Sequence, residues 1–179
     1  MLIRRETPSD IPAIRAVTAA AFAGIDHSAP PGEPGGDPGE AVLVGWLRAD
    51  PGWIPELSLV AIGEASEVVG HVMCSRGSVG AAPVLGLGPV SVAPDHQGRG
   101  VGSALMHAVL GAADARGEPL VALLGDPGFY RRFGFRPAAG YGIAAPDASW
   151  GDYFQVRTLA AHDPSMTGTF TYAEPFSRL

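Results

Sequence analysis

The sequence predicts an α/β fold of the α+β type, with about four helices around a mixed, mainly antiparallel sheet of six or seven strands. Two observations carry this prediction. Residues 57–62 and 68–76 are apolar runs joined by a short polar turn, which is typical of an antiparallel hairpin. Residues 84–92 and 120–124 are apolar runs separated by a helical segment, and a helical crossover makes two strands parallel.

Composition narrows the class of protein. With 179 residues, 46% of them hydrophobic, we expect one domain that spans residues 1–179 and buries its own core. The net charge is −6 and all 12 basic residues are arginine, so nucleic acid and anionic membranes are poor partners. Cys74 is the only cysteine, which excludes an internal disulfide. The charged N-terminus lacks the apolar core of a signal peptide, and no apolar run approaches the ~18 residues of a membrane span, so we expect a cytoplasmic protein.

The first third of the chain predicts a strand, two helices and a long loop. Leu2–Arg5 alternates as a strand does, and Thr7-Pro8-Ser9-Asp10 begins a helix that continues to Phe22. Residues 40–50 predict a second short helix, ended by Pro51-Gly52. The intervening segment 24–39 is rich in proline and glycine, so it is either a wall of a binding site or a solvated linker. Its candidate contacts to an amine are Asp26, His27, Glu33 and Asp37.

The second strand of the hairpin carries His71 and Cys74. Their odd separation places them on opposite faces of the sheet, so they do not form a nucleophile and base pair. We expect a structural role for both, because single histidines and cysteines in strands are usually packed. No cluster of His, Cys or carboxylates has the spacing of metal ligands, so no metal is expected.

The stretch VSVAPDHQGRGVGS, residues 90–103, is the main candidate binding site. A strand stops at Pro94, and a glycine cluster then opens into a helix over about residues 100–116. Glycines leave main-chain N–H groups unobstructed, so several can point at one anion, such as a pyrophosphate. A stripe of Val101, Leu105, Ala108 and Ala112 is expected to pack this helix on the sheet. The candidate anion-binding residues are Gln97, Gly98, Arg99, Gly100, Val101, Gly102 and Ser103.

Two other kinds of glycine-rich site compete for this stretch. A phosphate loop for ATP or GTP needs Gly-Lys-Ser/Thr, and this chain contains no lysine. A dinucleotide fingerprint is matched by Gly98, Gly100 and the later Asp126, but Ser103 stands at the third glycine. The partial match keeps a nicotinamide-dependent oxidoreductase open as one hypothesis, although too little chain follows the turn to complete a doubly wound sheet.

The last third of the chain predicts one more helix and three strands. Leu120–Leu124 is a strand, and Asp126 caps a helix that begins at Pro127 and ends at Gly134. Tyr153–Leu159 and Thr167–Tyr172 read as two late strands.

The chain also meets a third glycine-rich pattern, in which a strand ending in Val-x-Pro is followed by Gln/Arg-x-x-Gly-x-Gly/Ala. The matching residues are Val92, Pro94, Gln97, Gly100 and Gly102. Here the chain resembles the GCN5-related N-acetyltransferases (GNAT), whose acyl-CoA pyrophosphate lies on this turn. Tyr130 with Gly134-Phe135 matches the family's Tyr-x-x-x-Gly-Phe ending. The blocks Leu87-Gly88-Pro89 and Gly125 to Phe135 are similar to those of a bacterial subgroup. The resemblance is specific over residues 84–137.

The resemblance implies a GNAT-like sheet in which the strand before the turn carries a bulge and splays from its parallel neighbour. Pro89, which cannot donate to a ladder, agrees with such a strand. Main-chain groups at Val90, Ser91 and Val92 would then hold the pantetheine arm of acetyl-CoA. Tyr130 would supply the proton for the departing thiolate.

By the same resemblance the enzyme is an acetyl-CoA-dependent N-acetyltransferase that acts by direct attack of a primary amine on a small molecule. Tyr141, Trp150 and Asp152 would wall the acceptor pocket, and two copies would pair through the late strands as a homodimer. Gly88 and Pro89 occupy the places where many relatives carry a catalytic base. Either a loop residue such as His27 or Glu33, or a water chain, must take that role. The missing base also motivates the alternative, a non-catalytic module that binds or senses acyl-CoA.

Overall fold

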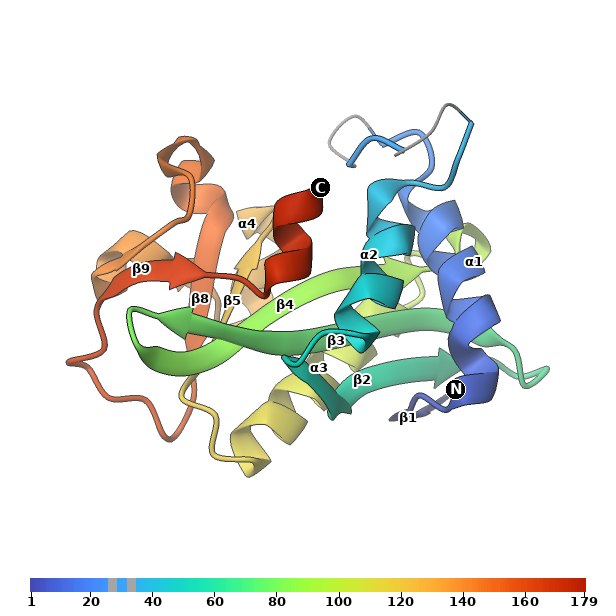
Figure 1. The fold of residues 1–179 in the computed structure, drawn as a ribbon. Coiled ribbons are helices and arrows are strands. Elements are labelled where there is room, and N and C mark those ends of the chain that lie inside the picture. The colour runs from blue at the N-terminus through green and yellow to red at the C-terminus, as the bar shows by residue number, and fades with distance from the viewer. Residues whose placement is uncertain (26–28, 32–34) are drawn as a thin grey trace.

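A twisted sheet runs through the molecule, and the chain's helices cover its two faces (Figure 1). The computed structural model describes residues 1–25, 29–31 and 35–179, and within these residues the sheet has nine strands. Its main order is β1 (Leu2–Arg5), β2 (Trp53–Ile62), β3 (Val68–Val79), β4 (Ala82–Val92), β5 (Leu120–Leu124), β8 (Phe154–Thr158) and β6 (Arg136–Pro137). The strand β9 (Gly168–Thr171) pairs with β3 and with β7 (Ile143–Ala144).

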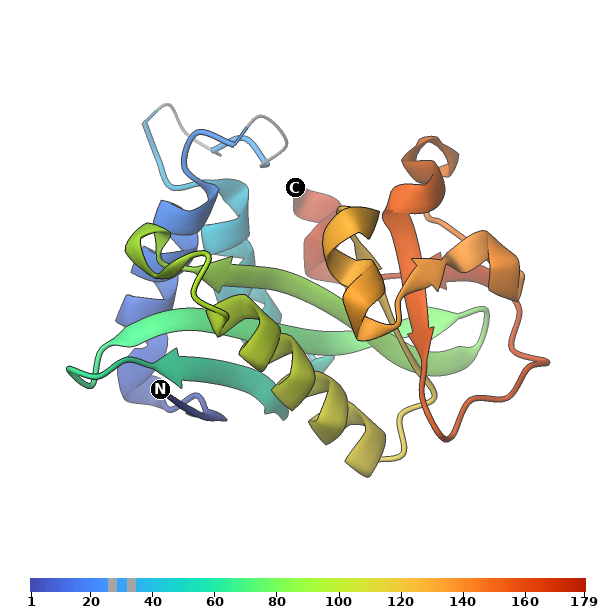
Figure 2. The same cartoon turned by 180° about the vertical axis from the view of Figure 1, so that it is seen from behind.

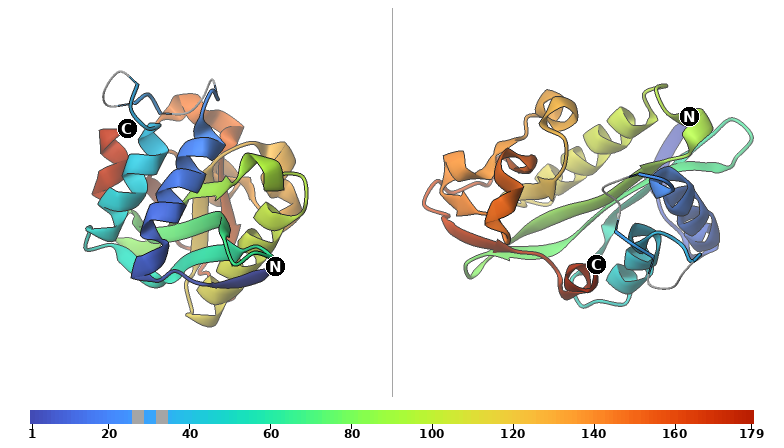
Figure 3. Two further views of the ribbon diagram at one scale, coloured as in Figure 1. Left: turned by 90° about the vertical axis from the view of Figure 1, so that its right-hand side faces the viewer. Right: turned by 90° about the horizontal axis from the view of Figure 1, so that it is seen from above.

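The helices form two layers. One face carries α3 (Val101–Ala115) and α4 (Pro127–Tyr130), and Figure 2 shows α3 crossing the sheet diagonally. The other face carries α1 (Ile11–Phe22) and α2 (Gly39–Arg48). A 3₁₀ helix at the C-terminus, Glu174–Arg178, lies beside α2, and the view from above in Figure 3 separates the two layers. None of the helices within the described ranges is long and apolar enough to cross a bilayer.

The predicted fold class is confirmed: the sheet is mixed and mainly antiparallel, with a parallel β4–β5 pair. All seven predicted strands and four predicted helices are present, and α4 continues as a 3₁₀ turn to Phe133. The sequence missed β6 and β7, which are two residues long and carry no alternating pattern. The predicted stripe on α3 was offset, because Val109 and Ala113 are buried while Ala108 and Ala112 lie at its partly buried margin.

His71 and Cys74 face opposite sides of the sheet, as predicted. Cys74 packs in the core beneath α3, and burial raises the pKa of its thiol. The His71 Nε2 atom lies 2.9 Å from Ser58 Oγ and 3.2 Å from Glu6 Oε2. Burial lowers the pKa of His71. Burial alone would raise the pKa of Glu6, but hydrogen bonds from His71, Arg48 and Ser58 outweigh it and lower that pKa to about 2. Both residues have surroundings that fit a structural role.

The strand β4 has a bulge and an open edge, and both features shape the site. Opposite β3, Val90 pairs with Val72 and Leu87 with Cys74, so the extra residue of β4 falls at Gly88-Pro89. On its other side, β4 pairs with β5 only at Leu85–Val121 and Gly86–Ala122. Beyond Gly86 the parallel pair has therefore separated, as the resemblance implied.

Candidate active site

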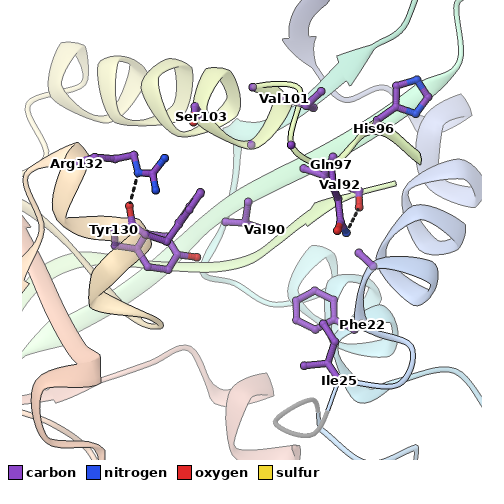
Figure 4. A pocket seen from close by; sticks show the side chains of 15 residues that line it. Phe22, Ile25, Val90, Val92, His96, Gln97, Val101, Ser103, Tyr130 and Arg132 are labelled. Atoms are coloured by element: carbon purple, nitrogen blue, oxygen red, sulfur yellow. Dashed lines mark hydrogen bonds between the residues drawn. The ribbon is translucent and has the colours of Figure 1, made fainter. Parts of the chain in front are cut away.

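A cavity of about 600 Å³ opens where β4 leaves β5. Its walls come from the end of α1, the end of β4, the glycine turn with the start of α3, and α4 (Figure 4). The lining residues are Ala21, Phe22, Ile25, Val90, Val92, His96, Gln97, Gly98, Gly100, Val101, Gly102, Ser103, Phe129, Tyr130 and Arg132. This volume is in the range of ordinary small-molecule sites.

The glycine turn presents free donors to this cavity. Gly98 and Gly100 adopt left-handed backbone conformations, with φ of 72° and 86°. Neither position has an atom within 4 Å of where a Cβ would lie, so the space beside the main chain is open. The first hydrogen bond of α3 runs from Ala104 N–H to Gly100 O, at 3.0 Å. The N–H groups of residues 101–103 precede it and have no acceptor within the helix, which makes this end of α3 suited to an anion.

The Gln97 side chain bonds to the strand β4 and not to a group on the open side of the turn. Its amide nitrogen donates to the Val92 carbonyl, at 3.1 Å. This bond fixes the turn against the end of β4.

Most of the predicted binding residues meet in this cavity, and two do not. Val90 and Val92 line it from β4, and six further residues of the predicted set follow in the turn and the start of α3. The Ser91 side chain points the other way, since its hydroxyl lies 3.1 Å from Thr18 Oγ1 and its exposed fraction is 1%. Arg99 is exposed and lies outside the lining. Alternation along β4 explains the first difference, because neighbouring side chains of a strand face opposite sides.

Tyr130 reaches the cavity from α4, on the side opposite the glycine turn (Figure 4). Asp126 caps α4 by accepting a hydrogen bond from Gly128 N–H at 2.8 Å, which fixes the start of the helix. The ring packs against Phe129 and Phe135, with centroid distances of 4.9 Å and 5.8 Å. Burial, together with the charge of Asp126, raises the pKa of Tyr130 to about 12. The phenol therefore stays protonated at neutral pH, which a proton donor requires.

Sequence reasoning missed several residues of the cavity. Phe22 and Ile25 form an apolar wall across from the turn, and their contribution depends on the way α1 ends. Arg132 lines the opposite wall, where its Nε donates to the Phe129 carbonyl at 3.0 Å and its guanidinium lies 4.9 Å from the Phe129 ring centre. The run Arg131-Arg132 was a visible signal of positive charge, but the sequence does not show which arginine faces the cavity.

Of the residues predicted to contact the amine acceptor, the four that the structure describes do not line the cavity. Asp26, His27 and Glu33 lie outside the described residues. Asp37 pairs with Arg15 at 2.7 Å. Tyr141 packs against His162 and Trp150 against Phe154, with centroid distances of 6.3 Å and 6.0 Å. Asp152 is exposed, and none of these last three lines the cavity.

Comparison with known proteins decides the family. Residues 3–138 match the family model described as an acetyltransferase (GNAT) domain. The chain is also 33% identical to the Escherichia coli N-acetyltransferase YhbS over 181 residues, which cover 99% of both chains. The chain belongs to the GNAT family. The predicted class of enzyme, an acyltransferase that uses acetyl-CoA, is confirmed at the level of this family.

Two solved GNAT structures show the same fold with a ligand. The crystal structure of Escherichia coli YhbS in complex with CoA matches with a TM-score of 0.83 at 32% identity, covering 99% of this chain and 92% of that one. A GNAT acetyltransferase from Brucella melitensis in complex with acetyl-CoA matches with a TM-score of 0.74 at 34% identity, covering 98% and 97%. Among the described residues of this chain, no group of three or more His, Cys, Asp or Glu side chains is placed to hold a metal.

Proposed function

We propose that residues 1–179 form a single-domain N-acetyltransferase that moves an acetyl group from acetyl-CoA to a primary amine of a small molecule by direct attack. One observation carries the proposal. The unpaired edge of β4 and the open glycine turn border one cavity, and Tyr130 faces the same cavity from α4.

The residues of this cavity fit acetyl-CoA. A diphosphate needs several N–H donors on one side, and the turn with the start of α3 offers them beside open space. An amide-containing arm needs strand-like partners, and β4 beyond Gly86 has an edge without a β5 partner. Val90 and Val92 add apolar contacts along that edge. These three features support main-chain binding at residues 90–92 and 97–103.

The proposed acyl transfer needs only a few chemical contributions from the residues of this chain. The unpaired main-chain amides of β4 polarise the thioester carbonyl by hydrogen bonding, as fixed dipoles do in an oxyanion hole. The amine nitrogen forms the new C–N bond while the C–S bond breaks, and Tyr130 gives its phenol proton to the departing sulfur. Water carries away the proton that the nitrogen loses and restores the proton of Tyr130. A cytoplasmic location and a homodimer through the late strands stay predictions.

A second function is favoured by one feature of the cavity. No carboxylate is among the described residues that line it, and Gly88 and Pro89 occupy the places of a base. This observation supports a module that binds acyl-CoA without transferring the acyl group. The two functions differ in thiol release: only the enzyme releases CoA thiol when amines are supplied.

The first experiment is a calorimetric titration with acetyl-CoA. Gly100→Glu places a carboxylate beside the N–H donors, and like charges about 4 Å apart near a surface repel by about 4 kcal/mol. We therefore expect affinity to fall by more than about 100-fold. Gly117→Glu is the matched control, because Gly117 has φ of 74°, open space beside it and a place at the other end of α3. The control should bind as the wild type does.

Turnover is then measured as thiol release over a panel of small primary amines. Release with any of them supports the transferase, and tight binding without release over the whole panel supports the binding module. If Gly100→Glu binds acetyl-CoA as well as Gly117→Glu does, the glycine turn is not the diphosphate site and the proposal is wrong.

A further inference from the structure

The cavity is bordered from both faces of the sheet. The glycine turn, the start of α3 and α4 line it from one face. Ala21, Phe22 and Ile25 line it from the end of α1, the helix that lies on the other face (Figure 4). Val90 and Val92 lie between the two groups, on the part of β4 that has no β5 partner. When acetyl-CoA occupies the turn and this edge, the end of α1 borders the side that is left for the amine.

The two groups of lining residues differ in polarity. The first offers main-chain N–H donors and the side chains of His96 and Arg132. The second, which consists of Ala21, Phe22 and Ile25, offers hydrocarbon side chains, and no carboxylate is among the described residues that line the cavity. Ile25 is 49% exposed, so an acceptor can cover it. An apolar acceptor would remove this surface from water, whereas a second cation on the acceptor would find no counter-ion.

Aromatic rings continue this apolar border along the gap where β4 leaves β5. Gly86 is the last residue of β4 that pairs with β5, and a Cβ added there would lie 2.8 Å from Tyr172 Cδ1. A Cβ added at Gly88 would lie 3.8 Å from Phe176 Cε1. The two rings have centres 4.5 Å apart, and Phe176 also packs against the core beneath α1 and α2. The face of the gap that carries α1 is therefore apolar beyond Phe22 and Ile25 as well.

Apolar surroundings also suit a site without a carboxylate base. The attacking nitrogen must be uncharged, and burial lowers the pKa of an ammonium group because it disfavours the charged form. An amine that enters such a place gives its extra proton to water more readily. The absence of a carboxylate from the described lining thus agrees with an apolar acceptor.

We propose that Phe22 and Ile25 select the acceptor, and that the acceptor is a primary amine on an apolar alkyl or aryl body without a second charge. This inference rests on the proposed function and adds the substrate class to it. Each methylene that the two side chains cover should raise kcat/KM by up to about fourfold. Diamines and polyamines should be poor substrates, because their second ammonium would leave water unpaired.

The test compares matched amines at saturating acetyl-CoA, with thiol release as the measurement. Propylamine and hexylamine differ in apolar length, and hexylamine and 1,6-diaminohexane differ in one charge. In the wild type we expect kcat/KM to rise by about tenfold or more with the longer chain, and to fall by about tenfold or more with the second charge. Calorimetric titration of the enzyme–CoA complex with each amine should give the same order of Kd without turnover.

Ile25→Glu supplies the carboxylate that the described lining lacks. Because the Ile25 side chain is exposed, the fold should tolerate this change. The preference for hexylamine over 1,6-diaminohexane should fall by about tenfold or more, since the new carboxylate pairs with the second ammonium. Ile11→Glu is the matched control, because Ile11 is 38% exposed at the start of α1 and lies outside the lining. It adds the same charge and should leave the preference within about twofold.

Phe22→Ala removes the ring from the end of α1. We expect kcat/KM to fall by about fivefold or more for hexylamine and by less than about twofold for propylamine, because the shorter chain covers less of the ring. Equal losses for both amines would contradict a role of Phe22 in selection.

Two further results would overturn the inference. A wild type that prefers 1,6-diaminohexane to hexylamine would show that the acceptor does not lie among apolar groups. Equal changes of preference from Ile25→Glu and Ile11→Glu would show that Ile25 does not face the acceptor. Both results leave the proposed transferase intact, because thiol is released. If no amine releases thiol, the transferase and its acceptor class are both wrong.

Discussion

The two sides of the cavity are built in different ways. On the side proposed to bind acetyl-CoA, residues 97–103 are contiguous in sequence, and the two left-handed glycines shape the turn. On the opposite side, the cavity and the gap beside it depend on the end of α1, Gly86 in β4, Tyr130 in α4 and Tyr172 after β9. The first side is a local property of the chain, and the second is a property of the whole fold.

This difference explains why the sequence predicts a site for the cosubstrate but does not predict a site for the acceptor amine. A diphosphate is bound by main-chain N–H donors, and a short run of glycines in the sequence indicates where such donors lie. An amine is bound by side chains, and those of this cavity come from segments more than 100 residues apart. Changes on the cofactor side should therefore alter binding of acetyl-CoA, and changes on the other side should alter the rate of transfer.

The largest effect expected on the far side comes from Tyr130→Phe. Loss of the proton donor should lower kcat by about 100-fold, the usual contribution of a general acid, while the Kd for acetyl-CoA stays within about twofold. Burial and Asp126 raise the pKa of Tyr130 to about 12, so the wild-type phenol remains protonated and kcat should show no loss assigned to Tyr130 between about pH 8 and about pH 10. Steady-state kinetics beside a binding titration measure both quantities.

Gly100→Glu should show the opposite pattern, with binding lost first. The comparison breaks down if Tyr130→Phe instead weakens acetyl-CoA binding and leaves kcat unchanged.

Much of the fold was predictable because its signals are local. The hairpin β2–β3, the strand before the turn, and the cap of α4 all follow from patterns of a few residues. Pro89 predicted the bulge of β4, since a proline cannot donate to a ladder.

The acceptor side was harder to predict, for physical reasons. Tyr141 and Trp150 were expected to wall the pocket, yet their rings pack in a second core around Phe154. Tyr172 was read only as the end of a strand, and its place at the gap depends on Gly86, which lies 86 residues earlier in a different strand. A single sequence does not show which aromatic ring packs against which glycine.

The next largest effect tests whether Gly86 makes room for Tyr172. In Gly86→Ala the new Cβ would lie 2.8 Å from the Tyr172 ring, in a buried place, so either the ring or β4 must shift. We expect unfolding to be easier by about 1 to 3 kcal/mol, as for other overpacked cores. Gly111→Ala is the matched control, because Gly111 is exposed in α3 with nothing within 4 Å of its Cβ position. There alanine should stabilise the helix by about 0.5 to 1 kcal/mol. Denaturant unfolding of the two variants measures the contrast, and equal shifts would mean that Tyr172 does not press on β4.

The smallest effect concerns an arginine that the main-chain argument leaves out. Arg132 lines the cavity from the 3₁₀ turn after α4 and is held against Phe129 by a hydrogen bond and by its place over the ring. A guanidinium fixed in this way is suited to a phosphate group, and an exposed charge-assisted contact contributes about 1 to 2 kcal/mol. Arg132→Gln should therefore raise the Kd for acetyl-CoA by about tenfold at low salt, and by less as the salt concentration rises. Arg131→Gln removes the same charge one residue earlier, outside the lining, and should change the Kd by less than about twofold. If the two variants weaken binding equally, the arginines act only through the overall field of the protein, and binding of the diphosphate depends on the glycine turn alone.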